Sequence, residues 1–184
     1  MIGGFEMKKA ENLQACSSRI TEIADTINRK VSYRINQIES EISAGNDISS
    51  LPGRNCMNVL LLGDYQDEIK VTLEKTTGLP VTLLKFSKGA GHYKEKLNPD
   101  EQLNLFRTEF VQAIKRKGIV LCTDIDMIEF PFVLGYLVPA LEMCQDPSTE
   151  VHRDPLCALV ATFNVDGSGC MHAVRARFNC SLML

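Results

Sequence analysis

The spacing of hydrophobic residues predicts a long helix at the start of the chain. Over residues 5–44 an apolar residue recurs every three or four positions, which places these side chains on one face of an α-helix. The stripe is heptad-like with one shift in phase, a pattern typical of coiled coils. Its members are Leu13, Cys16, Ile20, Ile23, Ile27, Val31, Ile35, Ile38 and Ile42. The length of the helix favours a docking or coiled-coil role, and packing on the chain's own domain is the alternative.

Polar and helix-breaking residues separate this helix from the rest of the chain. Residues 45–55 contain Gly, Asn, Asp, Ser and Pro, and Gly45 stands where a helix commonly ends. This composition is typical of a loop or linker. We therefore divide the chain into a helical or coiled-coil segment with its linker, residues 1–50, and an α/β domain, residues 51–184.

From residue 57 onward, short apolar runs alternate with segments of helical period. Apolar runs bounded by Gly and Pro predict strands at 57–62, 80–86, 118–123 and 155–163. Helices are predicted at 64–76, 98–117 and 129–144, with a short helical turn at 172–177 and a last apolar segment reaching Leu184. Continuous apolar strands are typical of a sheet covered on both faces. The alternation predicts an α/β fold with a mainly parallel sheet, flanking helices and right-handed crossovers.

Two of these helices carry prolines that affect their shape. Asn98 is a good N-cap, because Pro99 follows at the first helical position and Asp100 and Glu101 lie in the first turn. Pro139 lies inside the helix predicted at 129–144 and should bend it.

Composition indicates an ordinary globular protein of a reducing compartment. The apolar fraction is 45% and the charged fraction is 23%, and no apolar run has the length of a membrane helix. No secretion signal is present, and the seven cysteines are scattered without a C-x-x-C pair. We therefore expect an intracellular, cytoplasmic protein without a disulfide framework, a zinc site or a membrane anchor.

Candidate chemistry follows the buried strand that starts at Gly118. The run ends at Thr123, and Asp124 and Asp126 come directly after it. Acidic residues at the carboxyl end of such a strand lie where open α/β sheets bind ligands, so both are candidate metal ligands or catalytic groups. The alternative is that these two carboxylates cap the following helix.

Four segments in order resemble the motifs of a P-loop ATPase of the AAA+ group, nearest to the MoxR type. Val59–Gly63 resembles the strand leading into a Walker A loop, and Gly118–Asp126 resembles a Walker B strand. Ala161–Asn164 is similar to a sensor 1 strand, and Ala173–Phe178 to the Ala-x-x-x-Arg-Phe segment that holds an arginine finger. The resemblance implies a P-loop NTPase, AAA+-like fold over residues 57–184. It also implies functional roles for Gly63, Lys70, Asp124, Asp126, Asn164, Arg175 and Arg177.

The first departure from this family lies in the Walker A loop. The motif G-x-x-x-x-G-K-[ST] surrounds phosphates with backbone N–H groups, and its lysine reaches the β- and γ-phosphates. Here the position of the second glycine is occupied by Asp67 or Glu68 and that of the lysine by Glu68 or Ile69, depending on the register. Lys70 is displaced by one or two positions and has no Ser or Thr beside it. Carboxylates at this place would repel a polyphosphate.

The second departure lies in the Walker B strand. Matching Asp124-Ile125-Asp126 to the family's Glu-Ile-Asp places Thr123 at the metal-binding aspartate and the shorter Asp124 at the catalytic glutamate. The chain also stops after the last predicted strand, where AAA+ proteins continue into a helical lid. Either the chain is truncated or the lid is absent, and both departures predict that ATP hydrolysis is lost.

These observations predict a catalytically degenerate AAA+-like pseudo-ATPase without a cofactor. It would act as a regulatory or assembly subunit through protein partners or self-association, using residues 5–44. The first alternative is an ATPase with a non-standard P-loop, which would bind ATP through Lys70 and Mg²⁺ through Asp124 or Asp126. The second is an α/β nucleic-acid-binding module, which the net charge of −3 does not favour. Its basic residues would be Lys94, Lys96, Lys115, Arg116 and Lys117.

Overall fold

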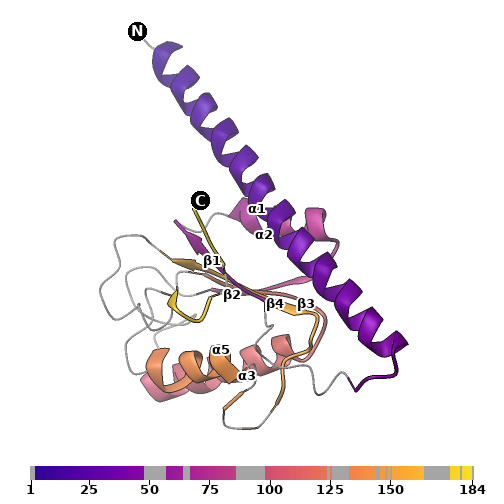
Figure 1. The fold of residues 1–184 in the computed structure, drawn as a ribbon. Helices are drawn as coiled ribbons and strands as arrows, with labels where there is room; N and C mark the ends of the chain where they lie inside the picture. The colour runs from indigo at the N-terminus through magenta and orange to yellow at the C-terminus, as the bar shows by residue number, and fades with distance from the viewer. Residues whose placement is uncertain are drawn as a thin grey trace.

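A computed structural model gives the fold of the chain (Figure 1). Within helix α1 only the backbone is described before residue 18. The described residues are 3–47, 57–63, 67–85, 98–123, 125, 133–143, 146–147, 149, 151–163, 175–178 and 180–183.

A five-stranded sheet forms the centre of the molecule, and its strand order is β2-β3-β4-β1-β5. All four described strand pairs are parallel. The strands are β1 (Asn58–Leu62), β2 (Val81–Lys85), β3 (Gly118–Thr123), β4 (Cys157–Phe163) and β5 (Cys180–Met183). The helices are α1 (Gly3–Ser43), α2 (Asp67–Thr77), α3 (Pro99–Ile114), the π-helical η4 (Val133–Leu137) and α5 (Val138–Met143).

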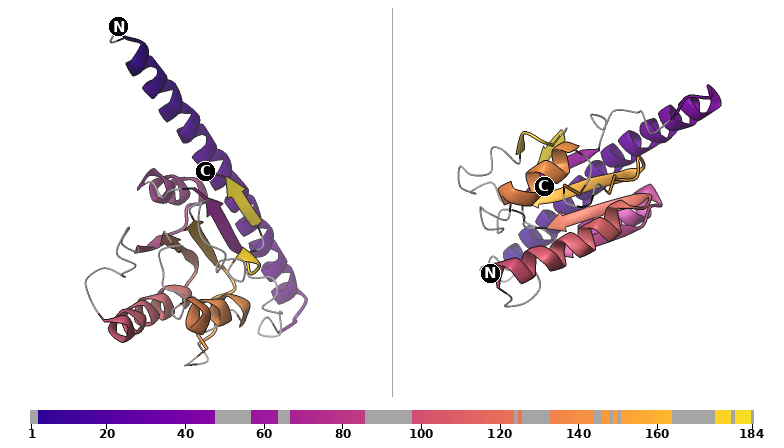
Figure 2. Two further views of the ribbon diagram at one scale, coloured as in Figure 1. Left: turned by 90° about the vertical axis from the view of Figure 1, so that its left-hand side faces the viewer. Right: turned by 90° about the horizontal axis from the view of Figure 1, so that it is seen from below.

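The helices cover both faces of this sheet. Helices α1 and α2 lie on one face, and α3 and α5 lie on the other (Figures 1 and 2). Helix α2 connects β1 to β2 on the first face, while α3 and α5 lie in the connections that lead back through β3 to β4 on the second. The predicted fold class is therefore confirmed in its architecture: an α/β fold with a parallel sheet, flanking helices and a long N-terminal helix.

Two hydrophobic cores, one on each face, explain the continuous apolar strands. Leu60 and Leu159 point into the core shared with α3 and α5. Their neighbours Leu61 and Val160 point into the core shared with α1 and α2. Every residue of β3 and β4 is buried, because neither face of these two strands is left to solvent.

The apolar stripe of α1 packs on the chain's own body. Ile20, Ile23, Ile27 and Val31 are buried in the core that contains α2 and one face of β1, β3 and β4. Ile38 is also buried. Of the two interpretations that the sequence leaves open, intramolecular packing therefore holds for this part of the stripe, and that part is not free for a coiled coil.

Helix α1 runs against the direction of the strands and extends past them. Arg19 Nε donates a hydrogen bond of 3.3 Å to the carbonyl of Met183, at the carboxyl end of β5. We call the side of the sheet where the strands end the carboxyl edge, and the opposite side the amino edge. The part of α1 before Arg19 projects beyond the carboxyl edge (Figure 1). At 1.5 Å per residue, residues 3–19 span about 24 Å.

The predicted helix ends agree with the structure where a capping residue determines them. Asn98 accepts a hydrogen bond from the Glu101 amide, and the Glu101 carboxylate accepts one from the Asn98 amide, which completes a capping box. Gly45, at φ 75°, ends α1, and its N–H donates to Ile42. Pro139 has no N–H to donate, and the turn before it is the π-helical η4 rather than a simple bend.

No helix in the described part of the chain has both the length and the apolar character needed to cross a membrane.

Replacing Ile27 by Ala tests the docking of α1. The side chain is 1% exposed, so the variant should lose about 2–5 kcal/mol of unfolding free energy in urea titrations. Tyr33→Ala is the matched control on the same helix, because Tyr33 is 72% exposed, and it should change stability by less than about 0.5 kcal/mol. Equal small effects for both variants would show that α1 is not packed on the body.

Candidate functional site

The order of the strands marks a position on the carboxyl edge for ligand binding. From β1 the chain crosses to β2 at one side of the sheet and then returns through β3 and β4 toward β1. In open α/β sheets, ligands bind outside the carboxyl ends of the strands at such a reversal. The ends of β1 and β4 are neighbours here, since Leu62 pairs with Phe163.

Gly63 follows β1 and connects its end to the end of β4. Its N–H donates a hydrogen bond of 2.8 Å to the carbonyl of Phe163, so the ends of β1 and β4 are tied together. Its φ of 147° lies in the region that favours glycine, which accounts for the residue type without a phosphate. Gly63 therefore lies at the reversal point, and its predicted role in binding a cofactor stays a prediction.

The start of α2 has the wrong charge for a phosphate site. Asp67 and Glu68 occupy the first turn and both are exposed. A helix N-terminus attracts anions, and here the chain's own carboxylates take that favourable position. Lys70 is in the next part of the helix, where its Nζ lies 3.6 Å from Oε1 of Glu74. Glu74 is one turn further along α2, so the Lys70 side chain is engaged away from the carboxyl edge.

A neutral group lies at the end of β3, where the resemblance to a Walker B strand implies a metal ligand. Thr123 is fully buried, and its Oγ1 has no hydrogen-bond partner among the described residues. A hydroxyl is a weaker magnesium ligand than a carboxylate. Asp124, Asp126 and Asn164 lie outside the described residues, so their candidate roles stay predictions. Among the described groups, Thr123 is neutral and Lys70 lies beside Glu74.

The two candidate arginines lie at the opposite edge of the sheet. Arg175 is exposed and Arg177 is half-buried, and both precede β5, which begins at the amino edge. The carbonyl of Arg177 accepts a 2.9 Å hydrogen bond from Asn58 Nδ2 at the start of β1. Because β1 is about 16 Å long, one copy of the chain does not bring these arginines together with Gly63.

Asn58 is the centre of a buried polar cluster that sequence reasoning missed. Its Oδ1 accepts a 2.8 Å hydrogen bond from Arg153 Nη1, and its Nδ2 donates to the carbonyls of Arg177 and Leu141, the latter at 3.4 Å. One side chain thus joins β1, α5, the segment before β4 and the turn before β5. The only signal in the sequence is a polar residue at the start of an otherwise apolar run.

Burial shifts the ionisation of the groups near this cluster. Loss of solvent lowers the pKa of Arg153 to about 10. Burial raises the pKa of the Cys157 thiol to about 11 and that of Cys122 to about 12. Both thiols are therefore protonated at neutral pH, and both pack in the hydrophobic core as small apolar side chains.

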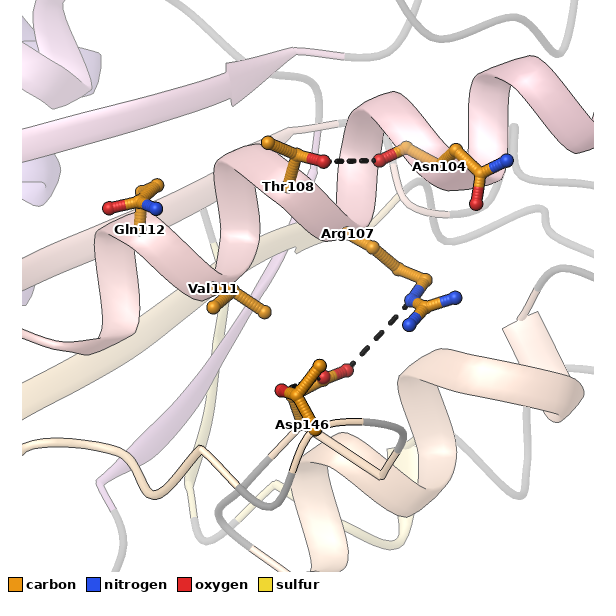
Figure 3. A pocket seen from close by; sticks show the side chains of 7 residues that line it. Asn104, Arg107, Thr108, Val111, Gln112 and Asp146 are labelled. Atoms are coloured by element: carbon orange, nitrogen blue, oxygen red, sulfur yellow. Dashed lines mark hydrogen bonds and ion pairs between the residues drawn. The ribbon is translucent and has the colours of Figure 1, made fainter.

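A second missed feature is a polar cavity of about 450 Å³ beside α3 (Figure 3). Nε of Arg107 lies 3.9 Å from Oδ1 of the fully buried Asp146, and its guanidinium lies 5.6 Å from the centre of the Tyr136 ring. Asp146 also accepts a hydrogen bond from Thr149 Oγ1. Burial raises the pKa of the Tyr136 hydroxyl, and the Asp146 carboxylate raises it further. These contacts join α3 to the turn after α5, so we assign the cluster a role in packing.

Metal ligation has no support in the described residues, which contain no group of three or more His, Cys, Asp or Glu side chains placed to hold an ion. The predicted metal ligands Asp124 and Asp126 are not among the residues to which this finding applies.

Comparison with known proteins finds similarity in fold only. No family model and no curated protein matches the sequence. Two mutants of Thermotoga maritima RuvB each have a TM-score of 0.45 and 14% identity, over 85% and 87% of this chain and 45% and 44% of theirs. A chain of the E. coli MS115-1 HORMA:CdnC:Trip13 complex has a TM-score of 0.49 and 14% identity, over 89% of this chain and 62% of its own.

The chain thus spans about half the length of the two RuvB structures and 62% of the third chain. Similarity at this level carries no argument about activity. The parallel register and the strand order define the fold.

Replacing Asn58 by Ala tests whether the buried cluster holds the arginine turn. The change leaves Arg153 Nη1 and two carbonyls without their partner, so unfolding should require at least about 2 kcal/mol less free energy. Limited trypsin digestion should also cleave after Arg175 and Arg177 faster in the variant. Asn46→Ala removes an exposed hydrogen bond to Glu41 and is the control. Unchanged cleavage after Arg177 in Asn58→Ala would contradict the assignment.

Proposed function

We propose that this chain is a catalytically degenerate, AAA+-like pseudo-ATPase that acts through protein contacts. It would serve as a regulatory or assembly subunit, and the MoxR-type resemblance and the cytoplasmic location belong to the same proposal. Because the chain spans only part of the structures it resembles, the activity and partners of the whole protein are part of what is proposed.

The observation that carries the proposal is the geometry at the start of α2. Asp67 and Glu68 fill the helix N-terminus, and Lys70 lies beside Glu74 instead of facing the ends of the strands. A nucleotide bound there would place its phosphates against two carboxylates. Two unit charges 4 Å apart repel by about 4 kcal/mol at an effective dielectric constant of 20, and a polyphosphate multiplies this cost.

The Walker B position supports the same proposal. Magnesium bridges phosphate oxygens and usually needs one or two protein carboxylates. Thr123 supplies only a buried, neutral hydroxyl at the end of β3. A metal ion could offset the negative charge of Asp67 and Glu68. Thr123 stands at the position that would bind this ion and is a poor ligand, so the offset is weakened.

A fold of this kind can bind other proteins even when it binds no nucleotide. The sheet, both hydrophobic layers and the anchored turn at Arg177 are well packed, and these features maintain a surface whether or not a nucleotide binds. The projecting part of α1 adds a helical surface beyond the body (Figure 1). A stable body with a projecting helix suits a subunit whose role is to bind other chains.

Titration of a fluorescent ATP analogue with Mg²⁺ tests the proposal. No saturable binding is expected up to about 1 mM nucleotide, the range of a very weak site. Lys70→Ala should give the same flat titration as the unmodified chain, and Lys30→Ala, which removes an exposed lysine of α1, is the matched control. Saturable micromolar binding that Lys70→Ala abolishes and Lys30→Ala preserves would instead establish the ATPase with a non-standard P-loop.

A further inference from the structure

A row of neutral hydrogen-bonding side chains lines the cavity beside α3. Asn104, Thr108 and Gln112 follow one another at intervals of four residues, and all three are exposed. Figure 3 shows these side chains along the helix, with Asp146 on the neighbouring turn. Thr149, from the same turn, also lines the cavity. We call Asn104, Thr108 and Gln112 the polar row.

The polar row can both donate and accept hydrogen bonds. The amide groups of Asn104 and Gln112 each carry an N–H₂ donor and a carbonyl acceptor. The hydroxyl of Thr108 donates a 2.8 Å hydrogen bond to the carbonyl of Asn104, and its oxygen keeps lone pairs that can accept. A surface of this kind suits an uncharged ligand that itself alternates donors and acceptors, and a peptide main chain is such a ligand.

The charged groups of the cavity balance each other. Nε of Arg107 lies 3.9 Å from Oδ1 of Asp146, which is fully buried. One positive and one negative charge at this separation leave little net field for an ion. The ligand that this cavity favours is therefore recognised by hydrogen bonds more than by charge.

The spacing of the polar row matches the repeat of an extended peptide. Four residues of an α-helix rise by about 6 Å, so the row is about 12 Å long. In an extended chain, every second residue presents its backbone groups to the same side, and two residues span about 6.6 Å. Each member of the row can therefore meet one alternate residue of a segment about five residues long.

Both sides of the cavity are held in place before any ligand binds. Phe106 and Phe110 are buried on the inner face of α3, so the polar row stays on its outer face. The Asp146 N–H donates a 2.8 Å hydrogen bond to the carbonyl of Val151, which fixes the neighbouring turn. A site that is ordered in advance loses less conformational entropy when a ligand binds.

We infer that the polar row binds an extended peptide segment of a partner protein through the main chain of that segment. Val111, half-buried between the row and the turn, gives one apolar contact for a side chain of the segment. The inference rests on the proposed function, because it assigns one of the protein contacts through which such a subunit acts.

Single-stranded nucleic acid is the other extended chain that polar side chains bind. Its backbone carries a negative charge at each nucleotide, and its bases stack on aromatic side chains. Arg107 is the basic residue among the described residues that line the cavity, and it lies beside Asp146. None of those lining residues is aromatic. The structure therefore favours a peptide.

Selection from a phage-displayed library of random heptapeptides on the full-length chain tests this inference. Enriched peptides are synthesised with a fluorescein label, and their Kd is measured by fluorescence polarisation. Asn104→Ala/Gln112→Ala should weaken binding about tenfold or more, because each lost amide removes hydrogen bonds to the peptide. Thr108→Trp fills the cavity from an exposed position and should abolish binding.

The control variant removes two exposed amides from another part of the chain. Asn36→Ala/Asn46→Ala should bind the peptides like the unmodified chain. Circular dichroism and urea titration check that each variant is folded. The Ala pair at positions 104 and 112 carries the test if Thr108→Trp does not fold.

N-methylation of the selected peptides gives the most specific result. The methyl group removes one main-chain donor at a time, and the donors of an extended chain point to opposite sides at successive residues. Methylation at alternate residues should weaken binding about tenfold, while methylation at the residues between them should change it little. A peptide bound as a helix would lack this two-residue period.

Four outcomes would overturn the inference. They are a library without an enriched peptide, peptides that bind Thr108→Trp as tightly as the unmodified chain, N-methylation without a two-residue period, and a labelled oligothymidylate whose binding Asn104→Ala/Gln112→Ala abolishes. None of them concerns ATP, so failure here is distinguishable from failure of the proposed function, which saturable binding of Mg²⁺-ATP would show.

Discussion

Burial of the parallel sheet on both faces is the constraint on which the rest of the structure depends. β3 and β4 have no exposed residue, so each face needs its own layer of helices. Helices α3 and α5 cover one face with an aromatic core around Phe106, Phe110 and Tyr136. Helix α2 alone is short, and α1 supplies most of the remaining cover through Ile20, Ile23, Ile27 and Val31.

Two-sided burial also decides where polar chemistry can lie. With both faces covered, exposed charges are confined to the helix surfaces and to the two edges where the strands begin and end. At the carboxyl edge the chain places acids in the first turns of α2 and α3, where the helix dipole favours them. At the amino edge it buries Asn58 and Arg153, and Asn58 holds the turn before β5 through the carbonyl of Arg177. The same parallel sheet therefore places the acids of α2 and α3 at one edge and this buried polar pair at the other.

Much of the fold could be predicted from the sequence because local chemistry determines it. The N-cap at Asn98, the end of α1 at Gly45 and the apolar strands depend on neighbouring residues, and all appear as predicted. The sequence did not determine what the apolar stripe of α1 packs against, because the same spacing of apolar residues occurs in a coiled coil and in a helix that packs on its own domain. The π-helical turn before Pro139 also differs from the predicted bend, since a proline removes a hydrogen bond without dictating how the turn adjusts.

The candidate site was predictable only in part. Gly63 and Thr123 lie at the carboxyl ends of β1 and β3, which are separated by β4, as their positions after apolar runs indicate. The pairing of Lys70 with Glu74 depends on helical register and could be suspected, whereas the Asn58 cluster joins residues from four separate segments and has no local signature. Arg107 and Asp146 likewise meet only through the packing of α3 against the turn after α5.

The central claim, that the carboxyl edge does not accommodate a nucleotide, is tested most directly by thermal unfolding with and without saturating Mg²⁺-ATP. A ligand that binds only the folded state raises its stability by about 2.7 kcal/mol at a hundredfold excess over Kd, whatever the site looks like. The account predicts an unchanged Tm, because Asp67 and Glu68 repel the phosphates and Lys70 is engaged by Glu74. A Tm that rises with nucleotide concentration would contradict it.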